Sequence, residues 1–168
     1  MRSPMRMQRS TVHRPRAVAA IAACLLVLAA PTAAQARGRH GHGAGAAVRV
    51  LRLVNEEREL AGCDPLTLNR RLSASARRHS GDMAFRRFMS HWGSDGSAPV
   101  DRIRRSGYRP AAWGENVAYG YRTPEEVMDA WMTSPSHRRN ILDCDYEEMG
   151  LGLAEPGDYW TQDFGTAR

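Results

Sequence analysis

The sequence contains no lysine, so all 24 of its basic side chains are arginines. Five of them lie within the first 36 residues, which hold no acidic residue. The formal charge of +6 therefore comes mostly from that segment, and the rest of the chain is close to neutral. Its arginines alternate with aspartate and glutamate instead of forming a basic stripe. Nucleic-acid-binding proteins carry such a stripe, so we expect no nucleic-acid partner.

Long hydrophobic runs are also missing. The apolar run over residues 17–30 has about fourteen residues, whereas a membrane-spanning helix needs about twenty. It follows an arginine-rich start and precedes Ala34-Gln35-Ala36, a small-x-small pattern typical of signal-peptide cleavage. We therefore predict a secretory signal peptide over residues 1–36 and a secreted, extracellular protein with no stable membrane insertion after cleavage. An uncleaved anchor is the alternative.

Cysteine is scarce, with three in the chain. Cys24 lies in the leader and is expected to leave with it. Cys63 and Cys144 remain, and an even pair in an exported chain indicates a disulfide first. A metal-binding thiolate pair and a catalytic thiol are the weaker alternatives.

The rest of the chain divides into an arm and one domain. Residues 37–46 combine glycine, histidine and arginine without an apolar face, which predicts a flexible, disordered arm. Residues 47–168 are enough for a single domain, which we expect to be a monomer. Helical spacing of apolar residues predicts helices over about 47–61 and 70–85, with residues 56–59 on the solvent side of the first.

Short helices and strands follow. A short helix is expected at 102–106, the capping box at residues 123–126 opens another, and Ser134-Pro135 begins a third that carries His137. Strands are predicted over 149–154, where apolar residues alternate with glycine, and over 159–164. Helices around a small, mainly antiparallel sheet predict an α/β domain with three layers.

Several ordered motifs carry a family resemblance. Residues 113–120 read Trp-Gly-Glu-Asn-Val-Ala-Tyr-Gly, which we interpret as a Gly-Glu-Asn turn. Ser90-His91 precedes it, and residues 134–142 (Ser-Pro-Ser-His-Arg-Arg-Asn-Ile-Leu) and 159–165 (Tyr-Trp-Thr-Gln-Asp-Phe-Gly) follow. Together they resemble the bacterial SCP-like branch of the CAP superfamily, which groups cysteine-rich secretory proteins, antigen 5 and pathogenesis-related class 1 proteins. The resemblance implies an α-β-α sandwich.

The resemblance also implies a cavity. CAP proteins resemble one another in a central cavity lined by two histidines and two acids that can bind a divalent metal such as zinc. His91 matches the first histidine and Glu115 the first acid. The chain departs from the eukaryotic pattern at the other two positions, which hold Ser134 and Tyr159. His137 is the candidate replacement for the second histidine.

His79 is the candidate fourth member of that metal site. It lies on the apolar stripe of the helix predicted over 70–85, where a histidine is more often a packed core residue than a ligand. Without the resemblance, the spacing of these histidines and Glu115 would not indicate a site.

The sequence offers no credible nucleophile. It has no Gly-x-Ser-x-Gly elbow, and a disulfide would consume both thiols. Asn116, Asn140 and Gln162 are expected to satisfy backbone groups around the cavity. The leading hypothesis is a non-enzymatic extracellular binding module for a metal or a small apolar ligand such as a lipid.

Apolar residues suited to such a ligand are Met83, Phe85, Phe88 and Met89, although ordinary core packing explains them as well. The alternatives are a metal-dependent hydrolase using His91, Glu115 and His137, and a wall- or host-interaction protein with an inert cavity.

Overall fold

The structure is a computed structural model that describes residues 33–168, with side chains from residue 43 onward. The predicted signal peptide lies almost wholly outside the described residues. Within the described part of the chain, no helix is both long and apolar enough to cross a membrane.

A four-stranded sheet forms the centre of the domain, in the order β1-β3-β4-β2. The strands are β1 (Thr67–Leu68), β2 (Pro110–Ala118), β3 (Glu148–Ala154) and β4 (Tyr159–Ala167). β1 pairs with β3 in parallel, and the other two pairings are antiparallel. The strands predicted over 149–154 and 159–164 are confirmed as β3 and β4, while β2, at the edge of the sheet, was not predicted.

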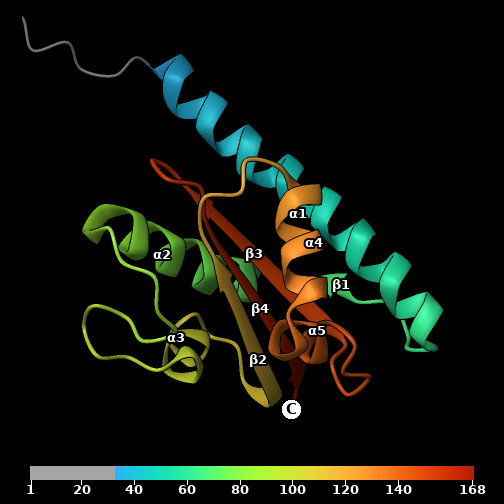
Figure 1. Ribbon diagram of the computed structural model, residues 1–168. Coiled ribbons are helices and arrows are strands. Elements are labelled where there is room, and N and C mark those ends of the chain that lie inside the picture. Colours follow the sequence, from blue (N-terminus) through green and yellow to red (C-terminus); the bar gives the residue numbers. More distant parts are fainter. Residues whose placement is uncertain (1–32) are drawn as a thin grey trace, which may run out of the picture. The chain divides into compact units, whose positions relative to one another are not determined.

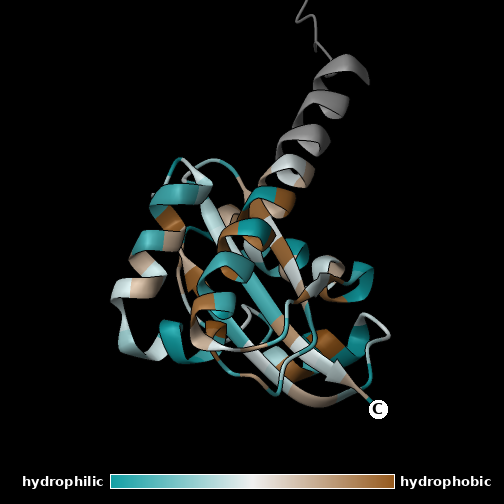
Figure 2. Ribbon diagram, turned by 90° about the vertical axis from the view of Figure 1, so that its right-hand side faces the viewer, coloured by the Kyte–Doolittle hydropathy of each residue, from teal (hydrophilic) through white to brown (hydrophobic). Residues whose placement is uncertain are grey.

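Helices cover both faces of the sheet. α2 (Arg70–Arg86) and α3 (Pro99–Arg105) lie on one side, and α1 (Ala33–Ala61), α4 (Pro124–Thr133) and α5 (Pro135–Ile141) on the other (Figure 1). Hydrophobic and hydrophilic residues alternate around the helices, as expected when one face of each helix packs inward (Figure 2). The predicted three-layer α-β-α architecture is confirmed.

Local signals explain where the helices begin. The Asn69 side chain accepts hydrogen bonds from the backbone of Arg71 and Leu72 at the start of α2. Thr123 accepts from the Glu126 backbone N–H at the start of α4, as its capping box predicts. Pro135 opens α5, but the preceding Ser134 makes no side-chain capping bond.

Residues 37–46 require a correction. They were predicted as a disordered arm, but α1 begins at Ala33 and runs through them. Adding a residue to an existing helix costs little once a nucleus has formed. Val50 and Val54, fully buried against the sheet, supply the packing that holds this nucleus. The glycines weaken the preceding turns without ending the helix.

Glycines let α2 lie directly on β3. A Cβ added at Gly150 would overlap the backbone of Leu72 and Ser73, and one at Gly152 would overlap the backbone of Ala76. The alternation of apolar residues and glycine along β3 therefore reflects a close helix-sheet approach. This approach places the polar side chains of α2 over the sheet.

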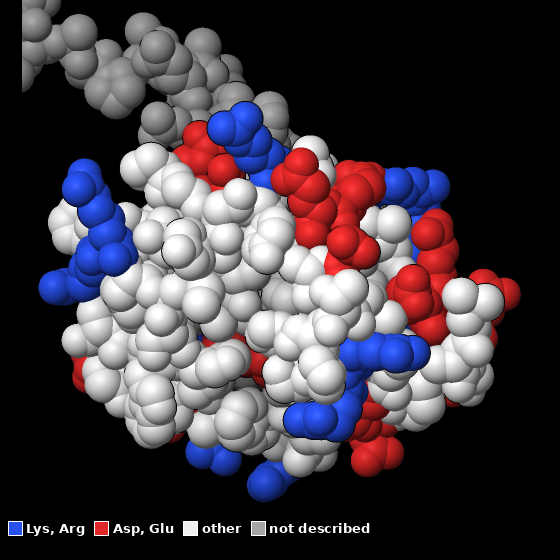
Figure 3. Space-filling view, in the orientation of Figure 1, with Lys and Arg blue, Asp and Glu red and all other residues white. Residues whose placement is uncertain are grey.

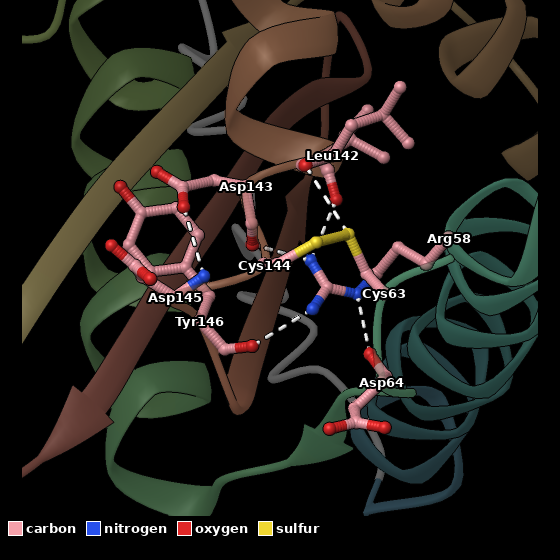
Figure 4. Close-up of a disulfide and its surroundings, with 9 residues drawn as sticks. Arg58, Cys63, Asp64, Leu142, Asp143, Cys144, Asp145 and Tyr146 are labelled. Carbon is pink, nitrogen blue, oxygen red and sulfur yellow. Dashed lines mark hydrogen bonds between the residues drawn. A yellow bond between two sulfur atoms is a disulfide. The ribbon is translucent and has the colours of Figure 1, made fainter. Parts of the chain in front are cut away.

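A buried arginine fixes the loop after α5. Arg58 was predicted on the solvent side of its helix, yet it is fully buried and donates to the backbone oxygens of Asp64, Ile141, Asp143 and Tyr146. Figure 4 shows this guanidinium beside the disulfide between Cys63 and Cys144. The predicted disulfide is confirmed. Arg58 stands four residues after Val54, on the same face of the helix, so the prediction was wrong because it followed the charge of the side chain and not its position.

The close packing of α2 on β3 generates a test. Gly150→Ala should lower the free energy of unfolding by roughly 3 kcal/mol, because the new methyl group meets backbone that cannot move aside cheaply. Urea-induced unfolding measures the change. Gly81→Ala on α2 is the control. A Cβ at Gly81 meets nothing within 4 Å, so this substitution should leave the free energy of unfolding unchanged or raise it slightly. Equal effects of both substitutions would contradict this packing.

Candidate functional site

Glu115 lies within strand β2. The Gly-Glu-Asn segment was predicted to be a turn, but residues 113–118 pair continuously with β4, so the turn prediction is wrong. Gly114 serves a different purpose: a Cβ there would meet the Tyr146 ring, whose hydroxyl donates to the Trp113 carbonyl oxygen at 2.9 Å. Glu115 faces α2 and α3 and stands opposite Asp163 of β4.

Two side chains hold the Glu115 carboxylate. Nδ1 of His91 lies 2.8 Å from Oε1, and Nη2 of Arg102 donates to Oε2 at 2.5 Å. The side chains of Glu115 and Arg102 are only 2% and 8% exposed, whereas that of His91 is 50% exposed. Both carboxylate oxygens are therefore occupied, and His91 presents its other ring nitrogen outward.

α3 and the loop before it deliver Arg102. Pro99 opens this short helix, and Nη1 of Arg102 donates back to the Ser97 carbonyl oxygen at 2.9 Å. The loop is held to α2 by Asp82, which accepts from the Ser94 backbone N–H at 2.8 Å and from the Ser94 hydroxyl. The loop after His91 thus positions the cation of the site.

Asp163 is a second buried acid, and the sequence reasoning missed it. It is 1% exposed, and neither of its carboxyl oxygens has a hydrogen-bond partner of normal geometry. Burial raises its pKa well above the usual 3.8, and the negative charge of Glu115 raises it further, while Ser75 and Arg102 oppose the shift. Because His91 and Arg102 serve Glu115, Asp163 is the carboxyl group that keeps a proton.

His79 is a core residue. It is 1% exposed, and its Nε2 lies 2.8 Å from the Ser90 carbonyl oxygen, which can only accept, so Nε2 carries the hydrogen. Burial is the main cause that lowers the pKa of His79. The imidazole is accordingly neutral near pH 7 and turned toward the loop.

His137 approaches from α5 on the other layer. Its backbone carbonyl accepts from Asn116 Nδ2 at 3.2 Å. Burial lowers the pKa of its imidazole first, and the neighbouring charge of His91 lowers it further. The two imidazoles thus lie within electrostatic range of each other.

The predicted metal set was His91, Glu115, His137 and His79. Of these, the structure joins His91 and Glu115 by a hydrogen bond. Among the residues it describes, no three His, Cys, Asp or Glu side chains are arranged to hold a metal ion. A zinc site needs free carboxylate oxygens and imidazole lone pairs. Because a guanidinium and an imidazole already hold Glu115, the residues present do not fit a zinc ion.

An amide network ties α5 to the sheet. Asn140 Nδ2 donates to the Glu115 carbonyl oxygen at 3.0 Å and to Asn116 Oδ1 at 2.8 Å. Asn116 Nδ2 in turn donates to Gln162 Oε1 at 3.1 Å. These three side chains satisfy each other and nearby backbone, as predicted, and so fix the strand that carries Glu115.

A pocket of about 410 Å³ opens beside the buried pair. His79 and Arg102 belong to its lining, together with Arg78, Arg105, Asp82 and Asp95. Arg105 donates to Asp95 at 2.9 Å across its rim. The pocket is therefore lined mainly by hydrogen-bonding and charged groups.

The four apolar residues that would suit an apolar ligand do not line one groove. Met83 is fully buried, and Phe88 packs against the small core cluster that contains it. Phe85 and Met89 are 84% and 50% exposed. The four residues therefore divide between core and solvent instead of lining one cavity, because Met83 and Phe85 lie on different sides of α2 and the other two follow its end.

Comparisons with known proteins agree with this fold. The model of the cysteine-rich secretory protein family, CAP, matches residues 51–164. The Bacillus subtilis (strain 168) protein YkwD is 40% identical over 116 residues, which are 69% of this chain and 45% of YkwD. The membrane protein YlbC of the same organism is 29% identical over 116 residues, 69% of this chain and 33% of YlbC. The chain spans less than half the length of these two relatives.

Two solved structures share the fold. An extracellular protein containing an SCP domain from Bacillus anthracis (strain Ames) has a TM-score of 0.70 at 24% identity, over 73% of this chain and 41% of that one. An outer surface protein from Borrelia burgdorferi has a TM-score of 0.66 at 21% identity, over 71% of this chain and 90% of that one.

The buried proton on Asp163 generates a pH-dependent test. Unfolded Asp163 ionises near its ordinary pKa of 3.8, whereas the folded group keeps its proton to higher pH. The folded state thus binds more protons in that interval, and wild-type stability falls as pH rises. Asp163→Asn has no proton to lose, so its stability relative to wild type should rise above pH 4, by at most about 1.4 kcal/mol per pH unit.

Urea unfolding at several pH values measures this difference. The exposed Asp129 on α4 supplies the control, since Asp129→Asn should change stability little at any pH. A stability difference between Asp163→Asn and wild type that stays constant from pH 4 to pH 8 would show that Asp163 is ionised in the folded protein.

Proposed function

This chain belongs to the CAP family of cysteine-rich secretory proteins, and we propose that it is a non-enzymatic binding module acting outside the cell. One observation carries the proposal: both oxygens of the Glu115 carboxylate are already engaged, by His91 and Arg102. Each oxygen thus already accepts a hydrogen bond from a side chain, and a metal ion that approached it would meet the positive charge of the Arg102 guanidinium. The role of Glu115 is to orient the groups around it.

Exposed aromatic rings support a binding role. Trp92, beside His91, is 61% exposed, and Trp113 is 41% exposed. Trp113 precedes Glu115 by two residues, so both side chains leave the same face of β2. Large exposed aromatic residues around a polar site are typical of binding surfaces. The two indoles belong to residues next to His91 and two positions before Glu115, and both offer contact area to a ligand.

The adjoining pocket indicates the kind of ligand. Its volume of about 410 Å³ falls in the range of small-molecule sites. Arginines and aspartates on its walls favour a ligand rich in hydrogen-bonding groups over a sterol or fatty acid. We therefore propose a small polar ligand in place of the apolar one expected from the sequence.

Action outside the cell rests on separate support. The leader pattern favours export, and the Cys63–Cys144 disulfide suits an oxidising compartment. The similar Bacillus anthracis and Borrelia burgdorferi proteins are extracellular and outer-surface proteins. Charges of both signs surround an uncharged centre on the face shown in Figure 3, which supports the expectation that nucleic acid is not the partner.

A second candidate function is hydrolysis with His91 as general base. The 2.8 Å contact from Glu115 to Nδ1 favours it, because a carboxylate in this position fixes the tautomer that leaves Nε2 free to accept a proton. No serine or cysteine is hydrogen-bonded to His91 within the described residues, so the base would have to activate water. The metal-dependent form of this reaction has no support in the donor arrangement.

An esterase assay separates the two functions. The wild-type protein should hydrolyse p-nitrophenyl acetate no faster than its His91→Ala variant, because an isolated imidazole supplies little catalysis without an oxyanion site. Glu115→Gln should leave the rate unchanged for the same reason. A loss of at least tenfold in both variants would establish the hydrolase and reject the binding module.

Solvent extraction of the natively purified protein tests the ligand class. We expect less than a stoichiometric amount of fatty acid or sterol by mass spectrometry. Recovery of one lipid molecule per protein molecule would instead support an apolar ligand and contradict the proposal of a polar one.

A further inference from the structure

Arg102 differs from the other arginines around the pocket. Its side chain is 8% exposed, against 55% for Arg105 on the same helix. Arg105 pairs with Asp95, which is itself exposed, whereas Arg102 pairs with the buried Glu115. An exposed arginine loses little when its partner is removed, but a buried one loses the negative charge that compensates its desolvation. Arg102 is thus held in the buried site by its ion pair with Glu115.

The charges of the buried site balance without any added ion. The guanidinium of Arg102 neutralises the carboxylate of Glu115 at 2.5 Å. A site that is already neutral gains no charge balance from a divalent cation.

We propose that Arg102 is the built-in cation of this site and excludes divalent metal ions from Glu115. A zinc ion would have to come within about 2.2 Å of a Glu115 oxygen and so displace the guanidinium or sit beside it. Displacement would bury the arginine without a partner, and coexistence would place like charges next to each other. This inference concerns metal exclusion, so it does not depend on whether the protein binds a small ligand.

The same geometry predicts how the site would change without Arg102. The Glu115 carboxylate would lose its cation, with Asp163 opposite it in the β-ladder and His91 already in contact. A carboxylate and an imidazole are donor types of a zinc site. Removing Arg102 should therefore let a zinc ion bind at Glu115 and His91.

Calorimetric titration with zinc chloride tests the proposal on the full exported chain. Wild-type protein should show no zinc binding that His91→Ala removes; binding that survives this substitution belongs elsewhere, such as His40 and His42. Arg102→Ala should gain a site at least tenfold tighter than any in wild type, and the added His91→Ala substitution should abolish it. Arg105→Ala, which removes the exposed arginine of the same helix, should gain nothing.

Two results would overturn the proposal. The first is zinc binding by wild-type protein that His91→Ala or Glu115→Gln abolishes. The second is a folded Arg102 variant, shown by circular dichroism, that gains no His91-dependent site. Arg102→Met keeps the aliphatic stem and the buried volume and serves if Arg102→Ala does not fold. Failure of the small-ligand proposal would leave these zinc titrations unchanged.

Discussion

A carboxylate buried on a sheet needs a cation, and this requirement organises the α2 face of the domain. Glu115 is 5% exposed on β2, where it has left most of its hydration behind. Arg102 meets the requirement, but only because α3 and the loop before it bring the guanidinium over the strand. The loop is tied to α2 through Asp82 and Ser94, so three parts of the chain depend on one ion pair.

The same ion pair limits the chemistry of the site. With Glu115 occupied and Asp163 protonated, the buried groups form a closed, neutral set in which only His91 reaches solvent. Gly150 pairs with Asp163 in the sheet, so the direct packing of α2 on β3 lies beside this set. What remains open is the surface: the outward side of His91, the indoles of Trp92 and Trp113, and the adjoining pocket. We therefore propose recognition as the function of this face.

The parts of the fold that follow from local physics could be predicted from the sequence. The capping residue Thr123 marks a helix start because its hydroxyl serves the first free N–H groups of that helix. The last two strands follow from their alternation, and the disulfide from the pairing of two cysteines in an exported chain. The motif resemblance supplied the rest of the architecture, including His91 and Glu115.

The parts that the sequence did not yield depend on partners distant along the chain. Arg58 and Arg102 look like ordinary surface arginines until the carbonyls and the carboxylate that hold them are known. Asp163 is one polar residue in a strand, and nothing in the sequence marks it as buried. The glycine of Gly-Glu-Asn indicates a turn as long as the Tyr146 ring, which occupies the space beside this glycine, is not known. His79 and His137 are residue types found in metal sites, but a histidine can bind a metal only if its imidazole points into the site. The orientation of His79 depends on the loop at Ser90, and the position of His137 depends on α5.

A double-mutant cycle on Arg102 and Glu115 tests the central claim most directly. Arg102→Met, Glu115→Gln and the double variant are compared with wild type by urea unfolding. Breaking a buried pair strands one charge, so each single substitution should cost about 3 kcal/mol or more, and the double variant should cost much less than their sum. The exposed Arg105–Asp95 pair, treated the same way, should show little coupling, because solvent screens both charges. Costs for Arg102 and Glu115 that add within about 0.5 kcal/mol would show that the pair does not organise the site.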